Sequence, residues 1–157
     1  MPSFAIDLGS LRQGRTPIDV EATAVDLGLS QDGWAGPIQG LFDVVKTGER
    51  VTVRGSVAAT ARLECFRCLA IFEWPVRVPL EVFAERAGSG RPGDEAALAR
   101  DEYMRFHDGR QLELREEARE LLLLELPMVP RCREDCRGLC PRCGEDLNTG
   151  PCGCSRE

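Results

Sequence analysis

The chain has 157 residues, of which 43% are hydrophobic and 29% are charged, and its formal net charge is −6. This length allows a hydrophobic core without disulfide staples, and the composition is that of an ordinary globular protein. The acidic balance argues against a protein that coats nucleic acid by bulk electrostatic attraction. The first ten residues lack a basic stretch followed by an apolar one, and no apolar run is long enough for a bilayer, so we expect neither a secretory signal nor a membrane span.

The first half of the chain predicts β-strands. Residues 4–8 form a short candidate strand, and residues 18–29 alternate loosely between apolar and polar types. Glycine and proline at 30–37 indicate a turn that breaks regular structure. The next two strands are predicted around Ile38–Val44 and at 51–63, with a hairpin turn at 47–49. The 51–63 stretch alternates without interruption and is the strongest strand signal in the chain.

The second half predicts one or two more strands and then a helix. Residues 69–85 read as extended, and Pro75 and Pro79 favour an edge position or a bend there. Glycines and prolines at 87–95 indicate a linker, and residues 103–114 are expected to form a short hairpin around Asp108-Gly109. From about Glu113 the leucines recur at helical spacing until Pro127 ends the pattern.

These elements predict a mainly β or α+β protein, an antiparallel β barrel or sandwich with one docked C-terminal helix. The body is expected to span 1–130, with the helix at about 113–126. A cysteine-rich tail at 131–157 is expected to pack on that body.

Six of the eight cysteines lie in the tail, which is otherwise rich in glycine, proline, arginine and acidic residues. We expect a cytosolic protein, where thiols stay reduced, so metal ligation is the first interpretation of this pattern. Cys140 and Cys143 have the spacing of a zinc knuckle, in which a tight turn points two sulfurs at one ion. Cys152 and Cys154 flank a glycine and face the same side of an extended segment. These four thiols predict one all-cysteine site.

Cys65 and Cys68 form a second knuckle at the end of the long strand, and Cys132 and Cys136 are their favoured partners. The i, i+4 spacing of that pair would place both thiols on one face of a helical turn. This pairing would clamp the tail to the β body. Two alternatives stay open, because spacing does not fix connectivity: Cys132 and Cys136 belong to the other site, or Cys65 and Cys68 bind no metal.

All-thiolate sets of four suit zinc, with an iron–sulfur cluster as the competitor, and we expect two structural zinc ions. Four protein ligands leave no open position for catalysis, so an enzyme is not expected. A redox dithiol at Cys65 and Cys68 is the weaker alternative, because a strand follows them where oxidoreductases place a helix. His107, the single histidine, and the glycines at 88–93 do not form a recognisable triad or phosphate loop.

Several quoted stretches resemble the YceD-like family, which is associated with accumulation of large-subunit ribosomal RNA. They are "ECFRCL" after a long strand, "ELLLLELPMVPRC", "CRGLCPRCGEDLN" and the final "CGC". The sequence is similar to the cysteine-rich branch of that family over most of its length. The resemblance implies a ribosome-biogenesis factor that is not an enzyme.

We therefore expect a cytoplasmic, zinc-stabilised, non-catalytic factor that supports accumulation or maturation of large-subunit ribosomal RNA. Its expected partner is the pre-ribosomal large-subunit particle, its RNA or an assembly protein, with no membrane and no small-molecule substrate. The RNA or partner contact is expected at four tail arginines: Arg131, Arg133, Arg137 and Arg142. The alternatives are a zinc-dependent protein-interaction module and, third, a thiol oxidoreductase.

Overall fold

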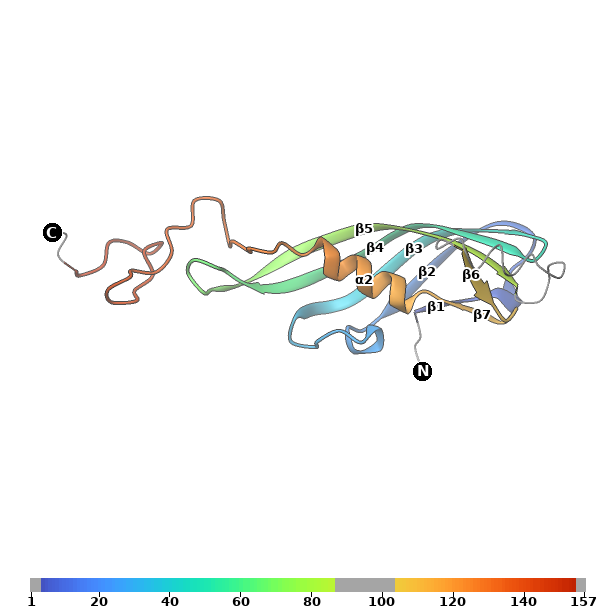
Figure 1. Ribbon diagram of the computed structural model, residues 1–157, viewed down its shortest axis with the longest axis horizontal. Coiled ribbons are helices and arrows are strands. Elements are labelled where there is room, and N and C mark those ends of the chain that lie inside the picture. The colour runs from blue at the N-terminus through green and yellow to red at the C-terminus, as the bar shows by residue number, and fades with distance from the viewer. Residues whose placement is uncertain (1–3, 87–103, 155–157) are drawn as a thin grey trace.

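A long, twisted five-stranded sheet forms most of the computed structural model, which describes residues 4–86 and 104–154. In sheet order its strands are β2 (Gly14–Ala22), β3 (Trp34–Thr47), β4 (Arg50–Glu64), β5 (Ile71–Arg86) and β6 (Met104–His107). The first four strands pair antiparallel, whereas β6 runs parallel to β5. The three long central strands give the molecule its elongated shape (Figure 1).

The predicted strand at 51–63 is confirmed as β4, which pairs with β5 along its whole length, from Arg50 opposite Glu85 to Glu64 opposite Ile71. Its alternate apolar residues, such as Val53 and Val57, are fully buried. Because a strand turns every second side chain to the same face, this pattern fixes which face of the sheet forms the core.

The covered face of the sheet carries a second layer. It holds a two-stranded sheet of β1 (Ala5–Asp7) and β7 (Gln111–Glu113), the α-helix α2 (Arg115–Glu125), and the 3-10 turns η1 (Leu8–Ser10) and η2 (Val25–Leu27). In α2, Ala118 and Leu122 are buried, and the helix packs mainly against β5. The predicted mainly β fold with one docked C-terminal helix is thus confirmed, but the described strands form an open sheet and close no barrel.

The predicted hairpin at 103–114 is wrong, because its two strands join different sheets: β6 pairs with β5 and β7 pairs with β1. The buried imidazole of His107 explains the divergence. Gly109 N–H donates to its Nδ1 (3.0 Å), and Nε2 therefore carries the proton and donates to the Glu49 carbonyl oxygen (3.0 Å). These bonds fix the end of β6 to the β3–β4 turn and send the chain away toward β1.

Two predicted boundaries also shift. The strand expected over 18–29 ends at Ala22, and η2 follows it. The turn expected at 30–37 reaches only part of that range, because β3 already begins at Trp34. Its glycine and proline lie in an irregularity of the β3–β4 register between Ala35 and Gln39. A β-bulge accommodates a glycine and a proline that would interrupt a regular strand, so β3 continues through them.

β5 is one continuous strand that contains both Pro75 and Pro79. Among the described residues β6 pairs only with Phe83–Arg86, so the outer side of β5 has no described strand partner near either proline, as expected for an edge position. The linker expected at 87–95 lies outside the described residues. After α2 the chain runs back along the sheet to the far end of the β4–β5 hairpin, where the cysteine-rich tail begins (Figure 1).

Candidate metal centres

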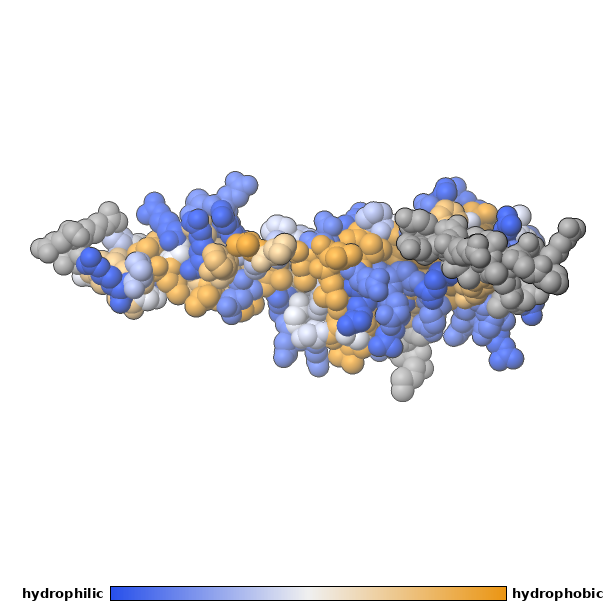
Figure 2. Space-filling model, viewed as in Figure 1, coloured by the Kyte–Doolittle hydropathy of each residue, from blue (hydrophilic) through white to orange (hydrophobic). Residues whose placement is uncertain are grey.

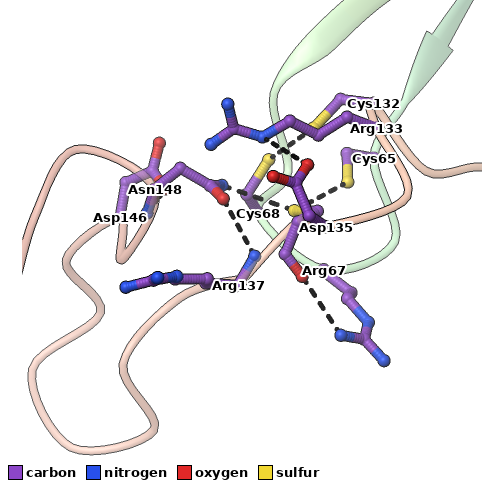
Figure 3. Close-up of polar contacts among 10 residues, drawn as sticks. Cys65, Arg67, Cys68, Cys132, Arg133, Asp135, Arg137, Asp146 and Asn148 are labelled. Carbon is purple, nitrogen blue, oxygen red and sulfur yellow. Dashed lines mark hydrogen bonds and ion pairs between the residues drawn. The ribbon is translucent and has the colours of Figure 1, made fainter.

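The first cysteine tetrad, here called the clamp site, joins the β4–β5 loop to the tail. It contains Cys65, Cys68, Cys132 and Cys136, whose sulfurs all lie within 4.8 Å of one another. The Cys65 and Cys136 sulfurs are 3.7 Å apart, and those of Cys68 and Cys132 are 3.6 Å apart (Figure 3). Three of the four residues are buried.

The second tetrad, the tail site, lies entirely within the tail. It contains Cys140, Cys143, Cys152 and Cys154. The Cys140 sulfur lies 3.5 Å from that of Cys152 and 4.0 Å from that of Cys154. Cys143 is exposed, so this site is more open to solvent than the clamp site. The two tetrads are the same two groups of four that the sequence spacing favours.

The donor sets fit a tetrahedral thiolate centre. Zinc–sulfur bonds of about 2.3 Å in a tetrahedron place neighbouring sulfurs about 3.8 Å apart. The four sulfur–sulfur distances given above, from 3.5 to 4.0 Å, bracket that value, and all are far longer than a disulfide bond. Each tetrad is therefore suited to hold one divalent ion, with Cys65, Cys68, Cys132 and Cys136 around one and Cys140, Cys143, Cys152 and Cys154 around the other.

The two knuckles share one backbone geometry. In the first, Cys65 N–H donates to the Ala70 carbonyl (2.8 Å) and Leu69 N–H to the Cys65 carbonyl (3.0 Å). In the second, the equivalent bonds run from Cys140 to Glu145 (2.8 Å) and from Gly144 to Cys140 (2.9 Å). This repeated turn aims two sulfurs at a single point in each loop. It requires a left-handed residue after the second cysteine, and Gly144 has φ 79° there.

Backbone N–H groups favour the thiolate form of one cysteine in each knuckle. The pKa of the Cys65 thiol is lowered to about 6, mainly by hydrogen bonding from the backbone of Cys68. The pKa of Cys140 is also lowered to about 6, by the backbone groups of Cys143 and then Arg142. Hydrogen bonds from backbone N–H groups stabilise a thiolate, so these turns favour the ionised form of sulfur that binds metal ions.

Other thiols in the same tetrads shift the opposite way. Burial, followed by contact with Cys68, raises the pKa of Cys132 to about 12. The neighbouring Cys143, followed by burial, raises the pKa of Cys154 to about 12. Four clustered thiols therefore resist full ionisation by themselves. A bound divalent cation supplies the positive charge that favours all four thiolates.

Asn148 connects the clamp site to the rest of the tail. Sequence analysis missed this residue, because no spacing rule identifies a side chain that donates a hydrogen bond to a metal-binding sulfur. Its side-chain N–H donates to the Cys136 sulfur (3.4 Å), and its Oδ1 accepts from Arg137 N–H (2.8 Å) (Figure 3). The Asn148 contact is the largest cause of the lowered pKa of Cys136. Groups of this kind orient metal ligands.

The clamp-site segment of the tail differs from the expected helical turn. Cys136 N–H bonds to the Arg133 carbonyl (3.3 Å) in a single irregular turn, so the two cysteines approach without a helix. Leu139 N–H then donates to the Arg67 carbonyl (3.2 Å), and the Arg67 guanidinium donates to the Cys136 carbonyl (3.1 Å). Arg67 of the loop thus contacts the tail through both its backbone carbonyl and its side chain.

The four predicted contact arginines, at 131, 133, 137 and 142, are all exposed. They lie in the tail around the two tetrads, and Arg133 forms an ion pair with Asp135 at 3.5 Å. Their contact role stays a prediction. α2 is the one α-helix in the described part of the chain, and with 11 residues it is too short to span a bilayer.

Comparison with known proteins places the chain among named relatives. The family described as "Large ribosomal RNA subunit accumulation protein YceD" matches residues 53–157. An uncharacterised protein of Mycobacterium tuberculosis strain H37Rv is 38% identical over 109 residues, which cover 69% of this chain and 50% of that protein. One from Mycobacterium leprae is 34% identical over 119 residues, covering 75% of this chain and 52% of that protein.

A plant relative carries a functional name. The Arabidopsis thaliana protein named large ribosomal RNA subunit accumulation protein YCED homolog 1, chloroplastic, is 24% identical over 183 residues, covering 98% of this chain and 57% of that protein. The chain thus spans about half the length of these relatives. No solved structure matches it. Because the family match extends from near the start of β4 through both tetrads and covers more than half of the chain, the chain belongs to the YceD family of large ribosomal RNA subunit accumulation proteins.

Proposed function

We propose that this protein is a non-catalytic, zinc-stabilised ribosome-biogenesis factor that supports the accumulation or maturation of large-subunit ribosomal RNA. The observation that carries the proposal is the presence of two four-cysteine tetrads in a member of this family. Four protein ligands leave a zinc ion no position for water or substrate, so its role is structural.

Zinc at the clamp site holds the tail against the end of the β4–β5 hairpin. The support for this role is the origin of its ligands: Cys65 and Cys68 come from the loop, and Cys132 and Cys136 from the tail. Zinc at the tail site then shapes residues 140–154. The metal content of protein purified without chelator tests this assignment: two zinc ions per chain support it, and iron with sulfide contradicts it.

The proposed partner is the pre-ribosomal large-subunit particle, through its RNA or an assembly protein, and the proposed location is the cytosol. The name of the Arabidopsis relative supports a ribosomal RNA connection. Reduced cysteines without disulfide pairing support a reducing compartment. The exposed tail arginines supply a narrow cationic contact on an otherwise acidic chain.

A four-arginine variant tests the contact. Alanine replaces each of the arginines at 131, 133, 137 and 142. The control variant replaces four exposed arginines of the body: Arg12, Arg62, Arg77 and Arg110. Both variants lose the same charge, so only the position differs. We expect the tail variant to lose binding to large-subunit precursor particles and to lower the ribosomal RNA level, while both variants keep two zinc ions. Equal behaviour of the two variants contradicts the contact.

Salt dependence separates an RNA contact from a protein contact. If phosphates are bound, the logarithm of the affinity falls steeply with the logarithm of the salt concentration, with a slope set by the number of phosphates neutralised. A shallow slope with purified precursor particles favours the second candidate, a zinc-dependent protein-interaction module. The exposed apolar residues beside the clamp site favour that candidate as well.

The absence of catalysis is tested at Cys65, because its lowered pKa would favour thiol chemistry. Zinc-bound thiolates react slowly with alkylating reagents, whereas a redox dithiol reacts at once. We expect slow alkylation of Cys65 and Cys68 in the zinc-loaded protein and fast alkylation after chelation. Fast alkylation with zinc retained contradicts the structural role.

A further inference from the structure

Hydrophobic side chains are exposed where the β body meets the tail. We call this the junction surface, and it comprises Phe66, Leu69, Ile71, Met128 and Val129. The β4–β5 loop and the linker after α2 lie side by side there, because Phe66 N–H donates to the Pro130 carbonyl (2.7 Å). Figure 2 shows hydrophobic residues at the solvent boundary in this region. Met128 is 99% exposed, so the molecule itself does not cover it.

The backbone conformation of Leu69 indicates that the exposure of this surface has a functional reason. It has φ 62° and is the one non-glycine residue with a left-handed backbone in the described part of the chain. The equivalent position of the second knuckle is Gly144, which adopts the conformation without a Cβ clash. A leucine there is strained, and its side chain is 54% exposed, so burial in the fold compensates only partly. The turn requires a left-handed residue there but not a leucine, so the strained leucine points to a function for its side chain.

The charge around the junction surface is negative. Five acidic residues lie in the same two stretches of chain, 64–73 and 125–135: Glu64, Glu73, Glu125, Glu134 and Asp135. Three arginines oppose them, at 67, 131 and 133, so the two stretches carry a formal charge of −2, and Arg133 is already paired with one of the acids, Asp135. Four thiolates around a divalent ion add a formal charge of about −2 at the clamp site. A partner that covers this surface must therefore bring positive charge.

We propose that the junction surface binds a basic polypeptide segment that carries aliphatic side chains. Four of the five side chains are aliphatic and offer no hydrogen bond to a base or phosphate, and although Phe66 could stack on a base, the net negative charge of these two stretches disfavours a nucleic-acid backbone there. The same features suit apolar anchors surrounded by lysine or arginine, as in interfaces with an apolar centre and a charged rim. This binding goes beyond the proposed RNA contact of the tail arginines and does not depend on it.

Methyl NMR of the zinc-loaded protein tests the proposal directly. The probes are a synthetic 20-residue peptide of lysine, leucine and valine, the same peptide with serine for the aliphatic residues, the same peptide with glutamate for lysine, and an oligouridine. We expect only the first peptide to shift the methyl signals of Leu69, Ile71, Met128 and Val129. Equal shifts with the serine peptide or the glutamate peptide overturn the proposal, as do shifts of Leu69 and Ile71 caused by oligouridine, or shifts confined to other parts of the protein.

Leu69→Gly separates binding from folding. Because glycine relieves the left-handed strain, we expect the denaturation midpoint and the zinc content to stay the same or rise. The affinity for the basic aliphatic peptide should fall about tenfold, as expected when one leucine is removed from an apolar contact. Leu41→Thr is the control, because Leu41 is 48% exposed but lies on β3, away from the junction. Loss of stability in Leu69→Gly, or equal affinity loss in both variants, overturns the proposal.

Discussion

Removing the two hairpin ligands, Cys65 and Cys68, by substitution with serine should detach the tail while the β body stays folded. The clamp site is the place where side chains of the β4–β5 loop and of the tail meet around one centre. Apart from cysteines, the apolar side chains of the described residues that pack against its buried cysteines are Phe72 and Leu139, and both are partly exposed. The body instead has a continuous core that spans both layers of the fold.

Estimated free energies indicate whether side-chain packing or a bound metal ion holds the tail on the body. Burial of one large apolar side chain contributes about 1.5–3 kcal/mol when complete, so two partly buried ones contribute roughly that amount together. Ordering the backbone costs about 1–2 kcal/mol for each residue, and the tail has many. A structural zinc ion contributes about 10–16 kcal/mol at neutral pH in small zinc-binding peptides. The two apolar contacts are therefore too weak to hold the tail by themselves, and a zinc ion at the clamp site would add a contribution several times larger.

Hydrogen exchange followed by NMR measures this outcome at two amides. Leu139 N–H bonds to the Arg67 carbonyl, and Phe66 N–H bonds to the Pro130 carbonyl, so both bonds cross the contact between loop and tail. We expect their protection to fall at least about a thousandfold in the double serine variant, which equals a loss of about 4 kcal/mol. Amides of the β4–β5 ladder should keep their protection.

The matched control is the double serine variant at Cys152 and Cys154, which removes two ligands of the tail site and leaves the clamp site complete. It should bind one zinc ion by native mass spectrometry and keep Phe66 protected. Our reasoning is refuted if Leu139 stays protected in the Cys65 and Cys68 variant, or in wild-type protein stripped of metal, because packing would then suffice.

Other substitutions test separate contacts. Gly138→Ala should weaken docking of the tail by about 1–2 kcal/mol, because φ is 78° there and a Cβ would lie 3.2 Å from a carbonyl oxygen of the β4–β5 loop. Competition with a chelator measures this loss. Gly153→Ala is the control and should cause no loss, because a Cβ there would have nothing within 4 Å. Asn148→Ala removes the bond that lowers the pKa of Cys136. Since a raised pKa lets protons displace metal sooner as the pH falls, one zinc ion should be released at a higher pH than in wild type, which an acid titration with a zinc indicator would detect; an unchanged release pH contradicts this role. Leu122→Ala should cost about 2–5 kcal/mol in urea unfolding because Leu122 is fully buried, and a cost below about 1 kcal/mol would contradict its place in the core.

The strands that sequence analysis located best are those with one buried face. Val51, Val53 and Val57 repeat with the period of a strand, and the structure buries all three. The same reasoning failed for the segment around Asp108, because β6 and β7 look like a hairpin locally. Their separation is accompanied by a part-buried hydrogen bond from His107 to the Glu49 carbonyl, 58 residues away in the sequence, and no local pattern encodes that contact.

The tetrads show a similar division. Knuckle spacing identified Cys65 with Cys68 and Cys140 with Cys143, because two cysteines three residues apart place both sulfurs on one side of a turn. Asn148 carries no such signal, since its role depends on the distance from its amide to the Cys136 sulfur.

By itself the sequence determined the β pattern, the helix before Pro127 and the thiol pairs, because each depends on residues that are close along the chain. Tertiary structure decided which pairs share a centre, since the 63 residues between Cys68 and Cys132 must first fold into β5 and α2. It also decided that Leu69, after the first knuckle, is exposed to solvent with a strained backbone, because exposure and dihedral angles depend on the folded loop and not on the local sequence alone.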